Sequence, residues 1–464
     1  MASARTPCLL PTDPMRFPLS TACLVALLTA APARALDHAP VHFFVRKGAP
    51  MGGDGLSWET AFRRPEQALV RATNGDEVWL TEGTWTPQRR TDPQDPRSVT
   101  FAVPSGVRLR GGFEGWEASA DERLLGAAPT VLSGKLAGGQ GSAYHVVTLG
   151  SATALQVAQG MVQASELDQL TVTGGRADTP GHQRGGGLLA EGGFLRMTDC
   201  VMEDNRAGMG GAAWLAGGTF RLRRCLLRWN DAADKGGALG IQAAVCHVGG
   251  SRLVGNSADR GGAIYVHSIA TDALGGTPHV AFQSCVLSDN TARVGGAAFL
   301  QGSQSAGAGR AWFQSSTVAF NRATERSGGI HARVLTPMAA ESHVHNSIVW
   351  FNEAPLDPEL GGDHDLRAST VGDPSWTGSG VVSQDPRFVD GPARDLRLRW
   401  DSPCIDAGDN GLLPADLSDL DGDGFRGETL PRDVAGRRRI GGPSTQGLLG
   451  STPGVMTDLG AHES

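Results

Sequence analysis

The stretch Cys200-Val-Met-Glu-Asp-Asn205, followed by Gly210-Gly-Ala-Ala-Trp-Leu215, decides the fold, because close variants of it return along the chain. Each copy has a small residue, alternating apolar residues, an Asn, and then Gly-Gly-Ala with an apolar pair. Good copies begin again at Cys225, Ser251 and Cys285, and weaker copies flank them. The first Gly of successive copies lies at 185, 210, 236, 261, 295 and 327, so the period is about 25 residues. A repeat of this length built from short β-like runs is typical of a solenoid.

Within each copy the apolar residues can be assigned to strands. In one copy they are Phe220, Leu222, Cys225 and Leu227, with period two inside each pair and a break between the pairs. Period two indicates a strand, and the break indicates a bend that keeps both strands facing one interior. A third strand is expected after the Gly pair. Three short strands per turn predict an all-β fold, a right-handed parallel β-helix with a small α/β N-terminal cap and an irregular Asp/Gly-rich C-terminal cap.

The Asn of each turn is expected to stack on its neighbours, with its side-chain amide hydrogen-bonded to the turns above and below. The Gly pair is expected to supply backbone angles that are closed to other residues. The predicted ladder comprises Asn205, Asn230, Asn256, Asn290, Asn321 and Asn352.

The N-terminus has the pattern of a secretory signal peptide over residues 1–35. Met15-Arg16 supplies the basic start, Leu24 to Leu28 the apolar centre, and Ala33-Arg34-Ala35 the small-residue cleavage pattern. Translation could also start at Met15 instead of Met1. The mature chain is therefore expected to be exported, to an extracellular, outer-surface or periplasmic location. It contains no later segment apolar enough to span a membrane.

Three further segments are expected after the signal peptide. Residues 36–97 would form the N-terminal cap, in which an amphipathic helix covers the open end of the coil. Ser57 is a candidate N-cap of that helix, and Pro65 is an alternative first turn. Residues 98–355 would form the parallel β-helix, and residues 356–464 the C-terminal cap.

Charge and cysteine content narrow the function classes. The net charge of −7 argues against a nucleic-acid binder.

Cys200 and Cys225 occupy one stacked position, and neighbouring parallel strands are close enough for a disulfide. We favour the other interpretation, in which the cysteines are buried free thiols. The oligomeric state stays open. The five cysteines of the mature chain are Cys200, Cys225, Cys246, Cys285 and Cys404.

Several motifs resemble those of a known group of proteins. Gly55 to Phe62 resembles the opening of large exported bacterial β-helix proteins, and Arg110 to Trp116 resembles their next segment. The repeats look like those of polymorphic outer membrane proteins and pectate-lyase-like β-helices. Ser402 to Asp409 and Asp419 to Gly424 are similar to the "choice-of-anchor Q" domain. The resemblance implies the fold and an exported location, and implies little about activity.

The best candidate metal site is Asp419-Leu-Asp-Gly-Asp-Gly424. Carboxylates that alternate in a tight Gly turn can converge on one hard cation, so Asp419, Asp421 and Asp423 are candidate Ca²⁺ ligands. Leu430 stands where a bidentate Glu would complete the pattern, although Glu428 is close. The alternative is a solvated Asp/Gly turn without metal. No other cofactor is expected.

The acidic residues on outward positions do not form a catalytic pattern. They are spread over several turns, which is typical of a solvated exterior. A hydrolase would instead need paired acids at a set separation. His267, Asp272 and His279, around an insertion, form a weaker candidate cluster. The outward acids are Glu203, Asp204, Asp231, Asp234, Asp259 and Asp289.

The sequence therefore predicts a non-catalytic exported protein that presents a stiff face to a glycan or a surface protein. The alternative is a polysaccharide lyase or glycoside hydrolase acting on acidic, uronate-rich polysaccharide. Candidate recognition aromatics are Trp214, Trp229, Tyr265, Trp350 and Phe351.

Overall fold

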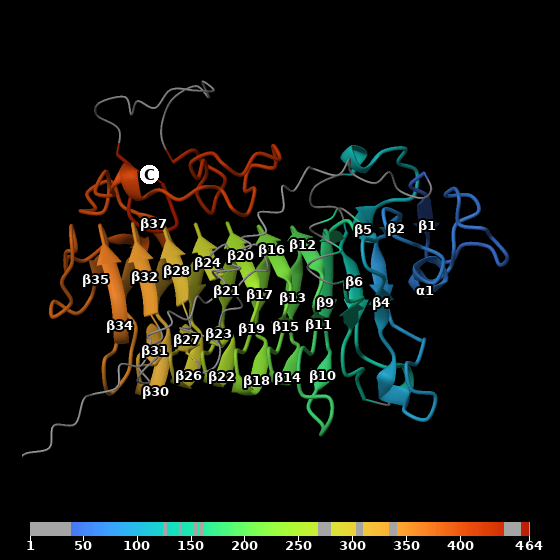
Figure 1. Cartoon of the computed structure of the whole chain (residues 1–464), viewed down its shortest axis with the longest axis horizontal. Coiled ribbons are helices and arrows are strands. Elements are labelled where there is room, and N and C mark those ends of the chain that lie inside the picture. Colours follow the sequence, from blue (N-terminus) through green and yellow to red (C-terminus); the bar gives the residue numbers. More distant parts are fainter. Residues whose placement is uncertain are drawn as a thin grey trace, which may run out of the picture.

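The computed structural model describes residues 39–123, 128–139, 141–152, 156, 159, 161–267, 280–302, 310–333, 341–439 and 456–463. The predicted signal peptide, Asp272 and His279 lie outside these residues. The described chain winds into a long coil of parallel strands (Figure 1), so the predicted parallel β-helix is confirmed. None of the helices in the described residues combines the length and the apolar character that a membrane crossing needs.

Each full rung of the coil contains four strands, where the sequence predicted three. We call the four stacks of strands the first, second, third and fourth walls, in the order in which the chain visits them. The third wall was missed because its inward positions hold small alanines such as Ala207 and Ala232, which give no alternating pattern of large apolar residues. The first and fourth walls merge at β34 (Leu360–Arg367), which pairs with both and joins them into a 19-stranded sheet.

The strands of the first wall are β1 (His42–Val45), β2 (Glu77–Thr81), β5 (Arg108–Phe113), β8 (Ser165–Asp168), β12 (Phe194–Thr198), β16 (Thr219–Arg223), β20 (Val245–Gly249), β24 (Val280–Gln283), β28 (Arg310–Gln314) and β32 (Glu341–His345). Those of the second are β3 (Gly83–Trp85), β6 (Thr130–Ser133), β9 (Leu170–Thr173), β13 (Val201–Glu203), β17 (Leu226–Arg228), β21 (Arg252–Val254), β25 (Val286–Ser288), β29 (Thr317–Ala319), β33 (Ile348–Trp350) and β35 (Thr370–Val371). Those of the third are β10 (Arg176–Ala177), β14 (Arg206–Met209), β18 (Asp231–Lys235), β22 (Ser257–Arg260), β26 (Thr291–Val294) and β30 (Arg322–Arg326). Those of the fourth are β4 (Phe101–Val103), β7 (Val147–Leu149), β11 (Leu188–Glu191), β15 (Ala213–Ala216), β19 (Leu239–Gln242), β23 (Ile264–His267), β27 (Ala298–Gln301) and β31 (Ile330–Arg333).

Like residues stack on like inside the coil. Leu195 pairs with Phe220, which pairs with Cys246 in the next rung, and all three side chains are buried. One continuous hydrophobic cluster runs through the interior from Phe43 to Val371. All five described cysteines are buried free thiols, as the sequence favoured, and they act as small apolar side chains.

Single residues in the left-handed region turn the chain at the corners. Asp199 (φ 52°) lies between the first two walls, Asp204 (φ 54°) precedes the Asn, and Gly210 (φ 64°) opens the Gly pair. The second Gly of the pair is required for space, because a Cβ on Gly237 would lie 2.2 Å from the carbonyl oxygen of Gly262. Both members of the pair are therefore constrained, one by backbone angle and one by the neighbouring rung.

The six asparagines stack in one buried column. The backbone N–H of each donates to the Oδ1 of the next, at 2.9–3.1 Å. The side-chain amide of each also donates to that same oxygen. At the last rung the amide of Asn352 donates instead to the Glu359 carboxyl group, at 2.6 Å. The column thus satisfies polar groups that would otherwise be buried without partners.

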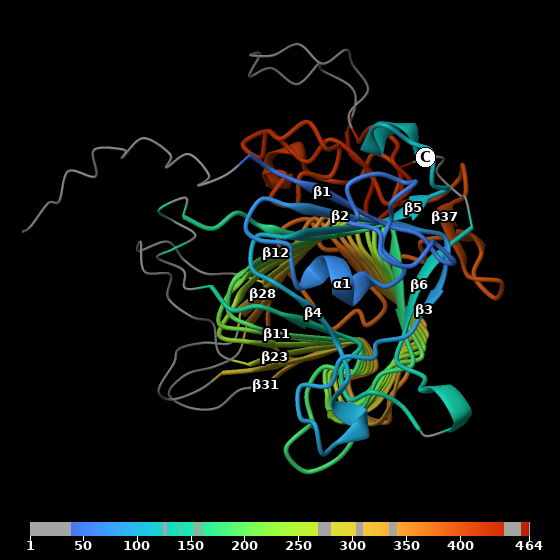
Figure 2. The same ribbon diagram turned by 90° about the vertical axis from the view of Figure 1, so that its right-hand side faces the viewer.

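A short helix fills the N-terminal end of the coil. Helix α1 (Pro65–Leu69) lies over the mouth of the interior (Figure 2) and buries Ala68 and Leu69 in the central cluster. It begins at Pro65 after Arg64, so the expectation that Ser57 caps a longer helix is wrong. The parallel pairing already starts at β1, so the segment expected to be a separate cap over residues 36–97 contains the first rungs.

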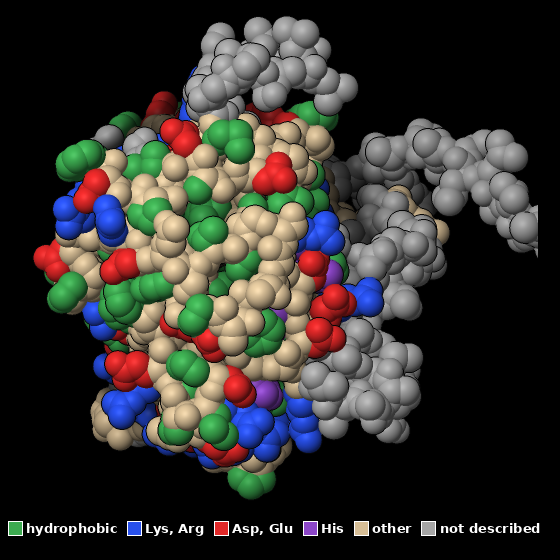
Figure 3. Space-filling view, turned by 90° about the vertical axis from the view of Figure 1, so that its left-hand side faces the viewer, with side chains coloured by type: hydrophobic (Ala, Val, Ile, Leu, Met, Phe, Trp, Pro, Cys, Tyr) green, Lys and Arg blue, Asp and Glu red, His purple; other side chains and the backbone are tan. Residues whose placement is uncertain are grey.

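At the other end the coil continues past the expected boundary at residue 355. Strands β34 and β35 extend the parallel pairing to Val371. Trp376 and Val381 then pack against the interior cluster. Figure 3 views this end, where hydrophobic side chains are scattered among polar and charged ones.

The rest of the C-terminal region lies along the side of the coil, over the outer face of the first wall (Figure 2). It contains the antiparallel pair β36 (Phe388–Asp390) and β37 (Asp395–Leu398). A second hydrophobic cluster joins Leu396 and Leu459 to Ile348 of the coil. The short 3₁₀ helices of the chain are η1 (Pro96–Ser98), η2 (Ala120–Glu122), η3 (Ala137–Gly139) and η4 (Asn410–Leu412).

Candidate functional site: a basic cleft beside an acidic loop

A cleft of about 460 Å³ opens on the outer face of the first wall. Its floor is made by β5, β8, β12 and β16, and its sides by residues 120–123 and by residues 418–426 of the C-terminal region. Figure 2 shows both flanking segments above this wall. We call it the basic cleft, because seven arginines line it against five carboxylates. The arginines are Arg110, Arg123, Arg196, Arg221, Arg223, Arg224 and Arg426.

The strand register explains why the arginines gather there. Alternation along a strand points Arg221 and Arg223 outward while Leu222 between them enters the core. Parallel pairing then sets Arg196 of β12 directly beside Arg221 of β16. Arg426 reaches the same cleft from the C-terminal region.

Most of these arginines already have an acidic partner. Arg123 lies 2.8 Å from Asp168, and Arg110 lies 3.1 Å from Glu166. Arg224 forms a bidentate pair with Asp199 in the preceding rung. These ion pairs hold the lining of the cleft in place. They do not compensate the positive charge of the remaining arginines.

Arg221 and Arg426 have no acidic partner among the described residues, and Nε of Arg426 is buried without a hydrogen-bond partner. The Nε and Nη1 atoms of Arg221 are likewise buried and have no hydrogen-bond partner in the described structure, and its guanidinium stacks 4.7 Å from the ring centre of Phe194. Burial, and then the nearby charges of Arg426 and Arg196, lower the pKa of Arg221 to about 10. A partly buried cation that faces two like charges is unfavourable on its own, and an anion placed between them would relieve the repulsion.

An acidic loop borders the same cleft. Oxygens of Asp419, Asp421 and Asp423 lie within 4.8 Å of one another, and so do oxygens of Asp416, Asp421 and Glu428. The structure thus brings the three predicted Ca²⁺ ligands together. It also adds two carboxylates that the sequence motif did not include, although Glu428 had been noted as close.

The loop is crowded with negative charge. Burial, and then Asp421, Asp423, Asp416 and Asp419, raise the pKa of Glu428 to about 7. The Oε1 atom of Glu428 has no hydrogen-bond partner in the described structure. An all-oxygen donor set of this kind fits a hard cation such as Ca²⁺, which takes six to eight oxygen ligands.

The loop is tied to the floor of the cleft. Nη1 of Arg223 donates to the backbone oxygen of Asp419 at 2.6 Å, and Leu420 packs against Gly250 of the coil. Asp419 therefore belongs both to the acidic loop and to the lining of the basic cleft.

The other candidate residues are not brought into this site. His267 lies at the end of β23 on the fourth wall, with its ring 6.1 Å from that of Tyr265. Three of the outward acids pair with arginines of neighbouring rungs, whereas Asp234 pairs with Lys235 of its own strand and Asp289 with Arg394 of the C-terminal region. The three pairs between rungs are Glu203 with Arg228, Asp231 with Arg206, and Asp259 with Arg293.

The structure sorts the candidate aromatic residues. Trp214 and Tyr265 are buried, and Trp350 is half-buried. Trp229 and Phe351 are exposed, at 55% and 42%. None of the five lines the basic cleft.

The arginine cluster was missed from sequence, although a signal existed. Arg196 and Arg221 stand at equivalent outward positions of successive repeats, 25 residues apart. On the outward positions only the acidic residues were considered as candidates. The contribution of Arg426 could not be found this way, because it depends on how the C-terminal region folds back.

Comparisons with known proteins show the fold and no more. No family model matches the chain, and no curated protein matches it by sequence. Among solved structures the chain is similar to the pectate lyase Pel9A, at 12% sequence identity and a TM-score of 0.51, over 92% of this chain and 97% of that one. This likeness supports a right-handed parallel β-helix of the pectate-lyase type.

Proposed function

We propose that the protein binds an acidic polysaccharide in the basic cleft. The observation that carries this proposal is Arg221, a largely buried arginine without a polar partner in a cleft where arginines outnumber carboxylates. A carboxylate of a uronate-rich chain would supply the missing acceptor, since a guanidinium presents planar donors that match it. The cleft volume lies within the usual range of ligand sites.

The acidic loop adds a second element to the proposal. A Ca²⁺ ion held by Asp419, Asp421 and Asp423 would offset part of the negative charge of the loop at the edge of the cleft. It would also leave coordination positions free for oxygens of an acidic ligand, because Ca²⁺ accepts more oxygens than three side chains provide.

We also propose that the protein acts outside the cytoplasm. The signal-like residues 1–35 and the similarity of the repeats to exported β-helix proteins support this. The similarity of Ser402 to Asp409 and Asp419 to Gly424 to the choice-of-anchor Q domain points to the cell surface.

A second candidate function is cleavage of the same polymer by elimination. In that reaction a base removes the proton on the carbon next to the uronate carboxyl group, a C=C bond forms, and the glycosidic C–O bond breaks. The specific observation in its favour is that the unpartnered Nε and Nη1 atoms of Arg221 lie in the same cleft as Asp419 of the candidate Ca²⁺ loop. Burial also lowers the pKa of Arg221, which favours the neutral form that a base needs.

Binding of polygalacturonate, alginate and neutral dextran by the full chain tests the proposal, with Arg221→Gln as the variant. We expect the acidic polymers to bind with Ca²⁺ present, the neutral one not to bind, and added salt to weaken binding. Arg221→Gln should weaken binding at least tenfold, about 1.4 kcal/mol. It should not lower the melting temperature, because it removes a partly buried charge.

The exposed Arg322 on the third wall provides the matched control, and Arg322→Gln should bind like the wild type. Failure of every acidic polymer to bind, or equal binding by Arg221→Gln, would refute the proposal. Ultraviolet absorbance of the conjugated C=C bond of unsaturated uronates in the same samples separates the two functions. Its growth would show elimination, and binding without it would support the non-catalytic role.

A further inference from the structure

Two histidines and an aspartate, residue types that can bind a metal ion, lie close together on the first wall, several strands away from the basic cleft. His343 and His345 stand two residues apart on β32, so alternation places both rings on the outer face of the wall. Asp365 of β34 is the register partner of His343 in the next rung. All three residues come from regular strands of the coil, which fixes their backbones relative to one another.

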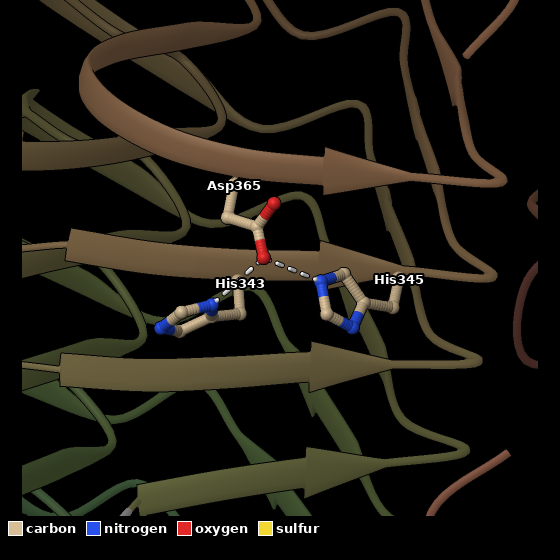
Figure 4. A group of neighbouring side chains, drawn as sticks. All are labelled: His343, His345 and Asp365. Carbon is tan, nitrogen blue, oxygen red and sulfur yellow. Dashed lines mark hydrogen bonds and ion pairs between the residues drawn. The ribbon is translucent and has the colours of Figure 1, made fainter. Parts of the chain in front are cut away.

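Both imidazole rings point at the same carboxylate oxygen (Figure 4). Nδ1 of His343 lies 3.1 Å and Nε2 of His345 lies 3.0 Å from Oδ2 of Asp365. The three ligand atoms all lie within 4.8 Å of one another. In a tetrahedral zinc site with bonds of about 2.0 Å, ligand atoms are about 3.3 Å apart. The existing separations therefore require only small side-chain movements to admit an ion.

Neighbouring side chains hold these three in place. Arg367 donates from Nε to the other oxygen of Asp365 at 3.1 Å, and Glu341 lies 3.7 Å from the far nitrogen of His343. The ring of Trp312 stacks on His343, with centroids 4.6 Å apart and planes 7° apart. Carboxylates and other partners behind ligand histidines commonly orient the ring and set its tautomer.

The site is only partly covered. The side chains of His343, His345 and Asp365 are 17%, 12% and 28% exposed. Three protein ligands with an open side are the arrangement found where zinc keeps one position for water or a ligand. Two imidazoles and one carboxylate favour Zn²⁺ and similar transition metals over Ca²⁺, which prefers oxygen ligands.

We propose that His343, His345 and Asp365 form a zinc-type metal site with an open fourth position on the outer face of the coil. The site lies outside the basic cleft and does not depend on glycan binding. On metal binding, each histidine gives up the proton on the nitrogen that faces Asp365 or moves it to the other ring nitrogen. His343 would then direct its Nε2–H toward Glu341.

The test uses the full chain without a polyhistidine tag, stripped with a chelator and titrated with Zn²⁺ by calorimetry. Excess Ca²⁺ is kept present so that the acidic loop does not compete for zinc. We expect one tight zinc per chain. The His343→Gln/His345→Gln double variant should lose it, and Glu341→Gln should bind about tenfold more weakly. His267→Gln, on another wall, should bind like the wild type.

Cobalt provides a measurement on the unaltered protein, so the result does not depend on whether the double variant folds. Co²⁺ added to the stripped wild type should give visible absorption bands of a four-coordinate ion, and zinc should abolish them. Absence of these bands, zinc binding by the double variant equal to that of the wild type, or loss of binding in His267→Gln would each overturn the proposal.

Discussion

Glu359 is a carboxyl group placed where the asparagine column ends. It accepts hydrogen bonds from the backbone and side chain of Asn352. In the other rungs these two bonds are accepted by the Asn of the following rung. Burial raises the pKa of Glu359 from 4.5 to about 8, although the hydrogen bonds from Asn352 act to lower it. The folded protein therefore holds a proton on this group at neutral pH, whereas an unfolded Glu releases it.

This difference makes wild-type stability depend on pH. The contribution of the protonated Glu359 is fully present below about pH 4.5 and is lost as the pH rises toward about 8. Glu359→Gln keeps the shape and cannot ionise. We expect the free energy of unfolding of the variant to match that of the wild type near pH 4.5. Near pH 8 it should exceed that of the wild type by more than about 1.4 kcal/mol, the energy equivalent of one pKa unit. Urea unfolding across this range measures it.

The exposed Glu353 offers a control, because Glu353→Gln should show the same pH profile as the wild type. A Glu359→Gln protein that is less stable than the wild type at the alkaline end would contradict the assignment.

At the scale of the rung, each Asn of the column forms hydrogen bonds that join three turns, which an apolar side chain at the same position could not do. Asn256 accepts from Asn230, donates to Asn290, and donates to the backbone oxygen of Leu227. We expect Asn256→Ala to destabilise the protein by about 3 kcal/mol, because it leaves several buried polar groups unpaired. Thermal or urea unfolding measures this change. Thr291→Ala, an exposed position on the next rung, should change stability by less than about 0.5 kcal/mol.

The acidic loop yields a prediction about metal binding. Asp421 belongs to both groups of converging oxygens. We expect Ca²⁺ to raise the melting temperature of the full chain, a chelator to reverse this, and Asp421→Asn to weaken calcium binding at least tenfold in calorimetry. Asp385→Asn, in an exposed turn of the C-terminal region, serves as the control. An equal calcium response in wild type and Asp421→Asn would remove the site.

The elements that repeat could be predicted from the sequence. Leu195, Cys200 and Asn205 each recur in phase, because stacked rungs impose the same environment on equivalent positions. The third wall could not be predicted from the sequence, because its buried residues, such as Ala207 and Ala232, give almost no periodic apolar pattern. Helix α1 was placed in the right segment, but the sequence left its start open between Ser57 and Pro65, because the extent of a short cap depends on tertiary packing.

The candidate site was only half predictable. Asp419, Asp421 and Asp423 are neighbours in the chain, so a local motif could indicate them. Arg221 and Arg426 are 205 residues apart and meet only because the C-terminal region lies along the coil. His343 and Asp365 likewise meet through strand register across an irregular segment, which a search for repeated phrases cannot follow.

For the whole molecule, Arg439 fastens the C-terminal region to the coil. Its guanidinium is fully buried, lies 2.7 Å from Glu463, and donates to Ser284 Oγ and to the backbone oxygen of Ser315. Removing one partner of a buried pair costs about 3–5 kcal/mol. We expect Arg439→Met to release the C-terminal region, so that limited proteolysis cuts after residue 385 while the coil stays intact.

Burial also raises the pKa of Glu463 to about 7 and lowers that of Arg439, so the pair is held against the preference of both charges for water. The double variant Arg439→Met/Glu463→Gln should therefore regain much of the protease resistance. If Arg439→Met alone were as resistant as the wild type, the fastening role would be wrong.

The register that sets Arg196 beside Arg221 also fixes the spacing between these two charges on the first wall. Their strands are about 4.8 Å apart, and the pleated backbone cannot stretch that interval. A ligand with charges repeated at a similar step can engage both guanidiniums at once, whereas a single sugar acid meets only one. Affinity should then climb steeply between a monomer and a short oligomer and level off once the cleft is spanned.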